Sequence, residues 1–258
     1  NVNDFPAWIT TSSPQDVTYT EVWQPHDSLA DLAAVATRAR TLAPQRPAVL
    51  AAYQNVYDHH PAEVADLTTR FTMATAFSHG ATQLLAGESG NVLVDPYYVR
   101  NHAAEASTLD MLAAWYDLLV AAGDLLLSPG NADITRSVAS AFNDEIDVLG
   151  PDGIVMSHEA RSGVVWRRVV ETAHGSVIHL INLTDQSETG WDTPKAPISA
   201  VTGLRLRVRR ITGDPPTVRV ADPDRGPRFI TVPALVNGDH AHAELPPLQV
   251  WQMVFLPR

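Results

Sequence analysis

The first half of the chain alternates short apolar runs with longer stretches of helical periodicity. The run at 17–23 is rich in β-branched and aromatic residues and alternates with period two, as a half-buried strand does. Further apolar runs follow at 47–53 and 81–86, and each precedes apolar residues at helical spacing. This alternation predicts βαβ units and a parallel sheet, either the last part of an eightfold (β/α) barrel or one wing of an open doubly wound sheet.

The first two expected helices carry signals at both ends. Asp27 or Ser28 is placed to cap the first helix, which should end before Pro44. Pro61 suits the first residue of the second helix, and Gly80 suits its stop.

The strongest helical pattern comes third, and the character of the sequence changes after it. This helix is expected to begin near Ser107, where Asp110 completes a Ser-x-x-Asp capping box, and to run towards Leu127. After Pro129, β-rich runs replace helical ones. The runs at 164–170 and 176–182 flank a glycine-containing turn and predict a hairpin, and further strand-like runs follow at 204–210, 217–220, 229–232 and 249–256. We therefore predict an α/β domain over residues 1–129 and an antiparallel β-sandwich over residues 130–258.

Composition and charge argue against two classes of partner, nucleic acids and membranes. The 258 residues are 45% hydrophobic and 18% charged, as in a packed globular protein, and the formal net charge is −11. The basic residues at 205–210 alternate with apolar ones, which is typical of the solvent-facing side of a strand. We therefore expect no nucleic acid partner. No apolar run approaches the ~20 residues that cross a bilayer, so no membrane partner is expected either.

Glu21 is the foremost candidate for chemistry. On a period-two strand it shares a face with Tyr19 and Trp23, and it stands near the carboxyl end of that strand. In α/β barrels the catalytic residues lie at this end of the sheet. Aromatic surroundings disfavour the charged form of a carboxyl group, as a general acid requires. The competing interpretation is a glutamate at a strand end that only forms an ion pair with an arginine or a lysine.

The ends of the neighbouring runs supply candidate substrate contacts. The aromatic ring of Trp23 can stack on a sugar, and Tyr53 with Asn55 suits a carbohydrate subsite after the second apolar run. Glu88 follows the third run and should reach the same edge, unless it only stiffens a glycine-rich loop. The pairs His59–His60 and His240/His242 lack the spacing of a metal site, so we expect no metal and no cofactor.

An ordered set of segments resembles one known family. Tyr-Thr-Glu-Val-Trp at 19–23, Val-Leu-Ala-Ala-Tyr-Gln-Asn at 49–55 and Leu-Leu-Ala-Gly-Glu at 84–88 resemble three successive barrel strands of glycoside hydrolase family 66. The segment 115–121 resembles the helix that closes its barrel, and 179–183 with Trp191-Asp192 resembles the opening of its C-terminal β-domain. The match runs in order from Asn1 to about Arg210. It implies the C-terminal part of a (β/α)8 catalytic barrel followed by a β-sandwich.

The resemblance also implies a reaction, because the family contains endo-dextranases and cycloisomaltooligosaccharide glucanotransferases. One carboxylate attacks the anomeric carbon of an α-1,6-linked glucan, and a second protonates the leaving oxygen and then deprotonates water, with the two groups ~5–5.5 Å apart. Glu21 corresponds to this acid/base by its position in the motif. The partner is then an α-glucan polysaccharide or oligosaccharide, and the location extracellular.

The resemblance places the nucleophile outside this chain. In the family it is an Asp on a strand upstream of the stretch that Asn1-Val2-Asn3 resembles, and Asp4 and Asp16 lie on the wrong side of that stretch. We therefore expect the N-terminal half of the barrel to come from the same polypeptide or from another chain. The 258 residues by themselves are expected not to hydrolyse dextran.

Several functions stay open on the sequence. The connection from Tyr53 to Pro61 is short and no β-rich insertion precedes Ser107, which favours a dextranase over a cyclising transferase with an inserted carbohydrate-binding module. The alternatives are that transferase, a barrel glycosidase acting on another linkage, a non-catalytic carbohydrate-binding protein, and a homologue that retains only the fold.

Overall fold

The structure, a computed structural model, describes residues 14–96, 101–138, 145–209 and 215–258. The chain divides into two compact units, of which the first comprises Asn1–Pro129 with Glu188–Pro197 and the second comprises Gly130–Ser187 with Ile198–Arg258. A single division after residue 129 therefore does not describe the segment Glu188–Pro197, which folds with the first unit. None of the helices that the structure describes is both long and apolar enough to cross a membrane.

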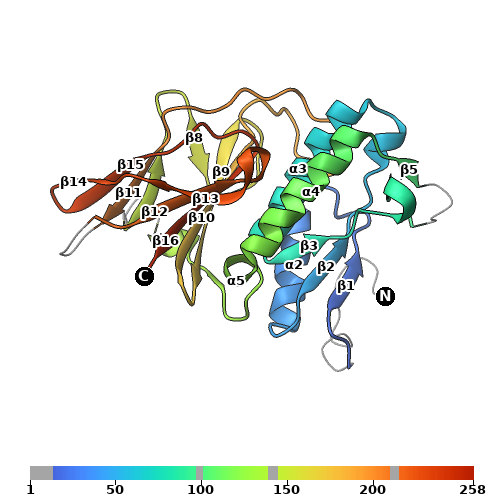
Figure 1. Ribbon diagram of the computed structural model, residues 1–258, viewed down its shortest axis with the longest axis horizontal. Helices are drawn as coiled ribbons and strands as arrows, with labels where there is room; N and C mark the ends of the chain where they lie inside the picture. The colour runs from blue at the N-terminus through green and yellow to red at the C-terminus, as the bar shows by residue number, and fades with distance from the viewer. Residues whose placement is uncertain (1–13, 97–100, 139–144, 210–214) are drawn as a thin grey trace. The chain divides into compact units, whose positions relative to one another are not determined.

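The first unit is built on a parallel sheet of three strands in the order β1-β2-β3 (Figure 1). Glu21, the last residue of β1, pairs with Ala51, the last residue of β2. The carboxyl ends of these two strands therefore lie at one edge of the sheet. The elements of this unit are β1 (Thr18–Glu21), α2 (Leu29–Leu42), β2 (Ala48–Ala51), η1 (Asn55–Asp58), α3 (Ala62–Ser78), β3 (Ala81–Gln83), η2 (Glu88–Gly90), β4 (Asn91–Val92), β5 (His102–Ala103), α4 (Ala106–Ala121) and α5 (Gly123–Leu126).

Two of the three expected helices have the expected ends. Ser28 caps α2 in a full capping box with Asp31, and the helix ends at Leu42. Helix α3 begins directly after Pro61, and Gly80 follows its end with a φ of 76°, where a glycine is favoured. Helices α2 and α3 pack against each other, and α3 packs against β3 (Figure 1).

The third helix differs from its prediction at both ends. Its N-cap is Glu105, which makes no side-chain capping bond, and Ser107 lies inside the first turn, so the predicted capping box is wrong. A tertiary contact sets the position of this turn, because the buried Thr108 hydroxyl donates to Asp66 at 2.8 Å. The helical pattern towards Leu127 is interrupted at Ala122, which separates α4 from α5.

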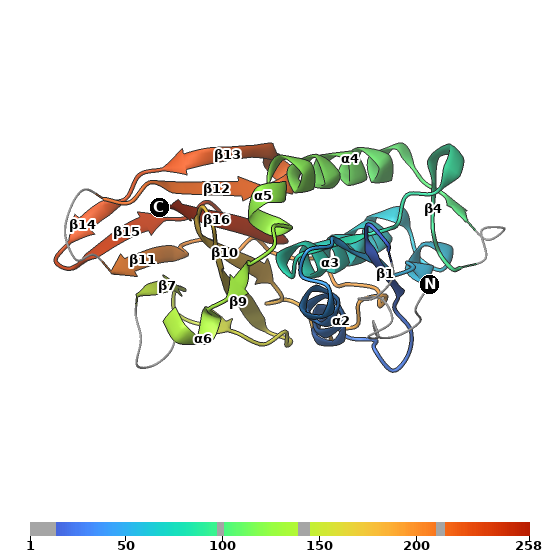
Figure 2. The ribbon, with the colours of Figure 1, turned by 90° about the horizontal axis from the view of Figure 1, so that it is seen from below.

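The second unit consists mainly of antiparallel strands in two sheets (Figure 2). The larger sheet has the order β13-β12-β16-β10-β9-β6, with β8 added to β9 in parallel, and the smaller has the order β14-β15-β11-β7. The predicted hairpin is confirmed as β9 and β10. The elements are β6 (Ala132–Asp133), α6 (Thr135–Val138), β7 (Ile146–Leu149), β8 (Val155–Ser157), β9 (Val164–Thr172), β10 (Gly175–Asn182), β11 (Arg205–Arg209), β12 (Val218–Asp222), η4 (Pro223–Arg225), β13 (Gly226–Val232), β14 (Leu235–Asn237), β15 (His240–Glu244) and β16 (Trp251–Pro257).

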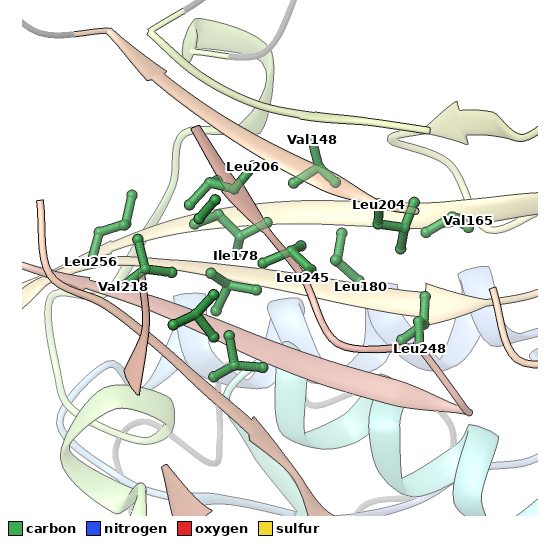
Figure 3. Packing of buried hydrophobic residues seen from close by; sticks show 14 of the residues in the cluster. Val148, Val165, Ile178, Leu180, Leu204, Leu206, Val218, Leu245, Leu248 and Leu256 are labelled. Carbon is green, nitrogen blue, oxygen red and sulfur yellow. The ribbon is translucent and has the colours of Figure 1, made fainter. Parts of the chain in front are cut away.

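One hydrophobic core joins these two sheets. Ile178 and Leu180 of the larger sheet and Val148 and Leu206 of the smaller sheet are all buried in the same cluster (Figure 3). Residues at alternate positions of the strands meet in this way because successive side chains of a strand point to opposite faces. Two mainly antiparallel sheets around a common core are consistent with the predicted sandwich.

Candidate active site

Three hydrogen-bond donors converge on the carboxylate of Glu21. The indole Nε1 of Trp23 donates to Oε2 at 3.1 Å. The phenol of Tyr53 donates to Oε1 at 3.2 Å, and that of Tyr19 approaches the same oxygen at 3.5 Å. Tyr19 is on the same face of β1 as Glu21, as the period-two pattern predicts, while Trp23 and Tyr53 each lie two residues after the end of β1 and β2. Of the side chains predicted to gather at this edge, those of Glu21, Trp23 and Tyr53 therefore do meet.

The two phenols remain protonated donors at neutral pH. Burial raises the pKa of Tyr53, and its hydrogen bond with Tyr19 and the nearby charge of Glu21 raise it further. Burial likewise raises the pKa of Tyr19. Glu21 itself is only 8% exposed. A buried carboxylate is costly unless hydrogen bonds satisfy it, and these aromatic donors do so while they fix its orientation.

A pocket of about 440 Å³ opens beside these residues. Its volume falls within the roughly 300–1,000 Å³ of small-ligand pockets. Trp23 and Tyr53, whose ring centroids are 5.9 Å apart, contribute aromatic faces to its wall. Glu21 is not a lining residue, but two of its three donors are. The pocket is lined by Val22, Trp23, Gln24, His26, Asp27, Tyr53, Asn55, Val94, Asp95, Pro96, Trp191, Asp192 and Thr193.

The segment Glu188–Pro197 supplies one part of this wall. Trp191 Nε1 donates to the carbonyl of His26 at 2.7 Å, and the Trp191 carbonyl accepts from the Thr72 hydroxyl of α3 at 2.7 Å. The Thr193 carbonyl accepts from Thr68, one turn earlier on α3, at 3.1 Å. Trp191-Asp192, interpreted from the sequence as the opening of the β-domain, thus belongs to the first unit and its pocket.

Asp192 is the pocket carboxyl with the clearest electrostatic perturbation. Burial raises its pKa from 3.8 to about 7, against hydrogen bonds from the backbone of Val56 and Asn55 and the charge of Lys195. Val56 N–H donates to Oδ1 at 3.0 Å. A carboxyl group in a pocket that titrates near neutrality can accept, and when protonated donate, hydrogen bonds to a polar ligand.

The remaining candidates from the sequence lie differently. Asn55 lines the pocket and begins η1. Glu88 is exposed in η2 and is not a lining residue. Asp4 lies outside the described residues. Within the described part of the chain, no group of three or more His, Cys, Asp or Glu side chains is arranged to hold a metal ion.

Sequence reasoning missed the contribution of Asp192 to the pocket. Val56 and Asp192 are 136 positions apart, so neither periodicity nor motif spacing connects them. The only available signal was that Trp191-Asp192 formed part of the family resemblance.

A second pocket, of about 570 Å³, lies in the second unit and has another character. Its lining includes Leu235, Val236, Arg205 and His242, but no Trp, Tyr or Phe. Aromatic faces beside a held carboxylate are found instead in the first unit, which makes the pocket at Trp23 the candidate site.

Comparisons with known proteins identify a matching family model and two similar proteins. The model of glycosyl hydrolase family 66 matches residues 1–255. The cycloisomaltooligosaccharide glucanotransferase of Niallia circulans is 24% identical over 213 residues, which cover 78% of this chain and 20% of that protein. The crystal structure of a Paenibacillus sp. cycloisomaltooligosaccharide glucanotransferase, complexed with cycloisomaltoheptaose, matches with a TM-score of 0.80 and 16% identity.

The structural match covers 96% of this chain and 53% of the Paenibacillus chain. The chain therefore spans about a fifth of the one relative and about half of the other. At 16% identity the structural likeness shows a shared fold. Because the family model extends over nearly all 258 residues, the protein belongs to glycosyl hydrolase family 66.

Proposed function

We propose that this chain is part of a retaining glycoside hydrolase that cleaves α-1,6-linked glucan as an endo-dextranase does, with Glu21 as the acid/base. One observation carries the proposal: three aromatic donors hold a buried carboxylate at the carboxyl end of a parallel strand, beside a pocket with aromatic walls. Family membership supports the reaction class. The cycloisomaltoheptaose complex of the Paenibacillus relative supports a glucan ligand.

In the proposed mechanism Glu21 acts twice. Its protonated carboxyl first donates the proton to the glycosidic oxygen, while a second carboxylate forms a bond to the anomeric carbon and the C–O bond to the leaving sugar breaks. The resulting Glu21 carboxylate then removes a proton from water, which attacks the anomeric carbon and releases the second carboxylate. Trp23, Tyr19 and Tyr53 keep the Glu21 carboxylate oriented through both steps.

The pocket residues are proposed to bind the sugar. Trp23 is 36% exposed, an unusual degree for an indole ring, and its face can pack on the apolar face of a pyranose. Tyr53 and Asn55 contribute a second ring and an amide. For Glu88, which is exposed away from these lining residues, we propose a contact with a more distant part of a long polymer.

The first unit is proposed to be the C-terminal part of a (β/α)8 barrel, since β1, β2 and β3 are parallel and each is followed by a helix. The nucleophile is then a carboxylate on a preceding strand, provided by the same polypeptide or by another chain. We accordingly expect no turnover of dextran by these 258 residues alone. Because such a polymer is met outside the cell, we propose an extracellular location.

Replacing Glu21 by Gln in the complete enzyme tests the assignment. Gln keeps the volume and accepts hydrogen bonds but has no proton to transfer, so kcat on dextran should fall by about 10²–10⁴, the contribution of a general acid/base. Binding of isomaltotriose should survive, and calorimetry would show this. Hydrolysis at the wild-type rate in Glu21→Gln would remove Glu21 from the mechanism.

A substrate with a good leaving group separates the acid/base from the nucleophile. An aryl α-isomaltoside needs little protonation to leave, so Glu21→Gln should still form the glycosyl-enzyme intermediate. Azide, which needs no general base, should then restore turnover and yield an α-glycosyl azide. If azide has no effect, or yields the β-azide, Glu21 does not have the proposed role.

The specific alternative is a transglycosylase that makes cyclic isomaltooligosaccharides. The names of both relatives favour it, since each is a cycloisomaltooligosaccharide glucanotransferase. The first chemical step is the same in both proposals. They differ in whether water or a sugar hydroxyl resolves the intermediate.

A further inference from the structure

The segment Glu188–Pro197 is rigidly built into the first unit although it comes late in the sequence. Gly190 forms an isolated antiparallel β-bridge with Ser28, the N-cap of α2, and Leu29 N–H donates to the Thr189 carbonyl at 2.7 Å. The buried Lys195 ammonium closes the segment by donating to Glu188 Oε1 at 2.5 Å and to the Gly190 carbonyl. Such fixed geometry is what a ligand-binding wall needs.

The attachments of this segment to α3 do not depend on the carboxyl group of Asp192. Trp191 and Thr193, on either side, use their backbone carbonyls to accept from α3. Asp192 accepts hydrogen bonds from the backbone N–H groups of Val56, at Oδ1, and of Asn55. An asparagine would satisfy the Val56 donor with its side-chain carbonyl, without the cost of burying a charge.

The position of the group is also informative. Asp192 lines the pocket together with Trp23 and Tyr53, the two rings whose polar atoms donate to Glu21. The hydroxyls of a sugar are donors, and a carboxylate is the strongest acceptor that a side chain offers them. Sugar-binding sites combine such acceptors with apolar ring faces.

We propose that Asp192 is a substrate-binding, specificity-determining residue, which accepts hydrogen bonds from glucan hydroxyl groups in the pocket of Trp23 and Tyr53. This inference rests on the proposed function of that pocket. It assigns to the segment Glu188–Pro197 a direct part in recognising the glucan. The competing role is structural, with Asp192 only fastening the start of η1 through Val56.

Two substitutions distinguish these roles. Asp192→Asn keeps the acceptor for Val56 N–H and removes the charge, whereas Asp192→Ala removes both. In the complete enzyme, Asp192→Asn should weaken the Kd for isomaltotriose and raise KM for dextran at least fivefold, with kcat within twofold of wild type. Asp124→Asn, which removes an exposed charge from α5, serves as the control and should change neither.

Each outcome decides the matter. If Asp192→Asn binds isomaltotriose as wild type does while Asp192→Ala does not, the role is the structural one and the inference is overturned. If both variants bind normally and the wild type hydrolyses dextran, the inference fails alone and the proposed function stands. If the wild type neither binds isomaltotriose nor acts on dextran, the proposed function fails with it.

Discussion

At the scale of single residues, Glu21 beside the pocket and Asp192 in its wall are carboxyl groups in contrasting surroundings. Three aromatic side chains donate hydrogen bonds to Glu21, and two of them, Tyr19 and Tyr53, are phenols whose pKa is raised. Asp192 is held by backbone N–H groups and has its pKa raised to about 7 by burial. Carboxyl groups in unlike environments at one pocket can take unlike tasks, one moving a proton and the other holding a ligand.

The raised pKa of Asp192 has a consequence for stability. A carboxyl that binds its proton more tightly when folded stabilises the fold fully below its ordinary pKa of 3.8, and this contribution is lost as the pH rises through about 7. The displacement corresponds to an upper bound on the order of 4 kcal/mol, at about 1.36 kcal/mol per pKa unit.

We therefore expect Asp192→Asn to be more stable than wild type at pH 8, with the difference shrinking as the pH falls towards 4. Urea unfolding of both proteins across this range measures the difference directly, and other titrating groups cancel in the comparison. A wild type as stable as the variant at pH 8 would show that the ionised Asp192 is well solvated or well paired. If Asp192→Asn is more stable than wild type at pH 8 but binds glucan more weakly, Asp192 serves binding at the expense of stability.

At the scale of elements, the segment Glu188–Pro197 depends on one glycine. A Cβ on Gly190 would lie 2.1 Å from the Thr193 hydroxyl oxygen, closer than real atoms approach, and 3.0 Å from Glu188 Oε2, which is a tight contact. We expect Gly190→Ala to displace the segment and to cost about 1–3 kcal/mol of stability, as overpacking does. Because Asp192 lies in this segment, the variant should also bind isomaltotriose more weakly.

Gly123→Ala is the matched control, because nothing lies within 4 Å of a Cβ at Gly123, on the first residue of α5. This substitution should be neutral or slightly stabilising, as alanine is the better helix former. Thermal unfolding and calorimetric titration of the two variants provide the measurements. Equal behaviour of Gly190→Ala and Gly123→Ala would contradict the close packing around Gly190.

The elements also show which features sequence patterns can reveal. The N-cap at Ser28, one of two candidates, and the hairpin of β9 and β10 were predicted because their partners are close in sequence. The capping box of α4 was predicted wrongly: Ser107 lies in the first turn, where Thr108 makes a tertiary hydrogen bond to Asp66 that the local Ser107–Asp110 pattern does not reveal. The same limit applies to the site: strand phase united Glu21 with Tyr19 and Trp23, whereas Asp192 reaches the pocket only through the tertiary fold.

At the scale of the whole molecule, the chain joins a parallel α/β unit to a second unit of mainly antiparallel strands with its own core. The chain belongs to glycosyl hydrolase family 66, and both hydrolysis and cyclisation can follow the proposed retaining first step. What separates them is the acceptor that reaches the glycosyl-enzyme intermediate. Cyclisation requires the far end of the same glucan to return to the pocket and be held there, whereas hydrolysis requires only water.

The connection after β2 favours water as the acceptor. Between Ala51 and the start of α3 the chain forms only the short η1, so no additional binding module is inserted there to hold a returning glucan end. We expect dextran to yield linear isomaltooligosaccharides, which mass spectrometry distinguishes from cyclic ones because each cycle is lighter by one water. Predominantly cyclic products would establish the transferase, and would show that the pocket of Trp23, Tyr53 and Asp192 holds an acceptor sugar without such a module.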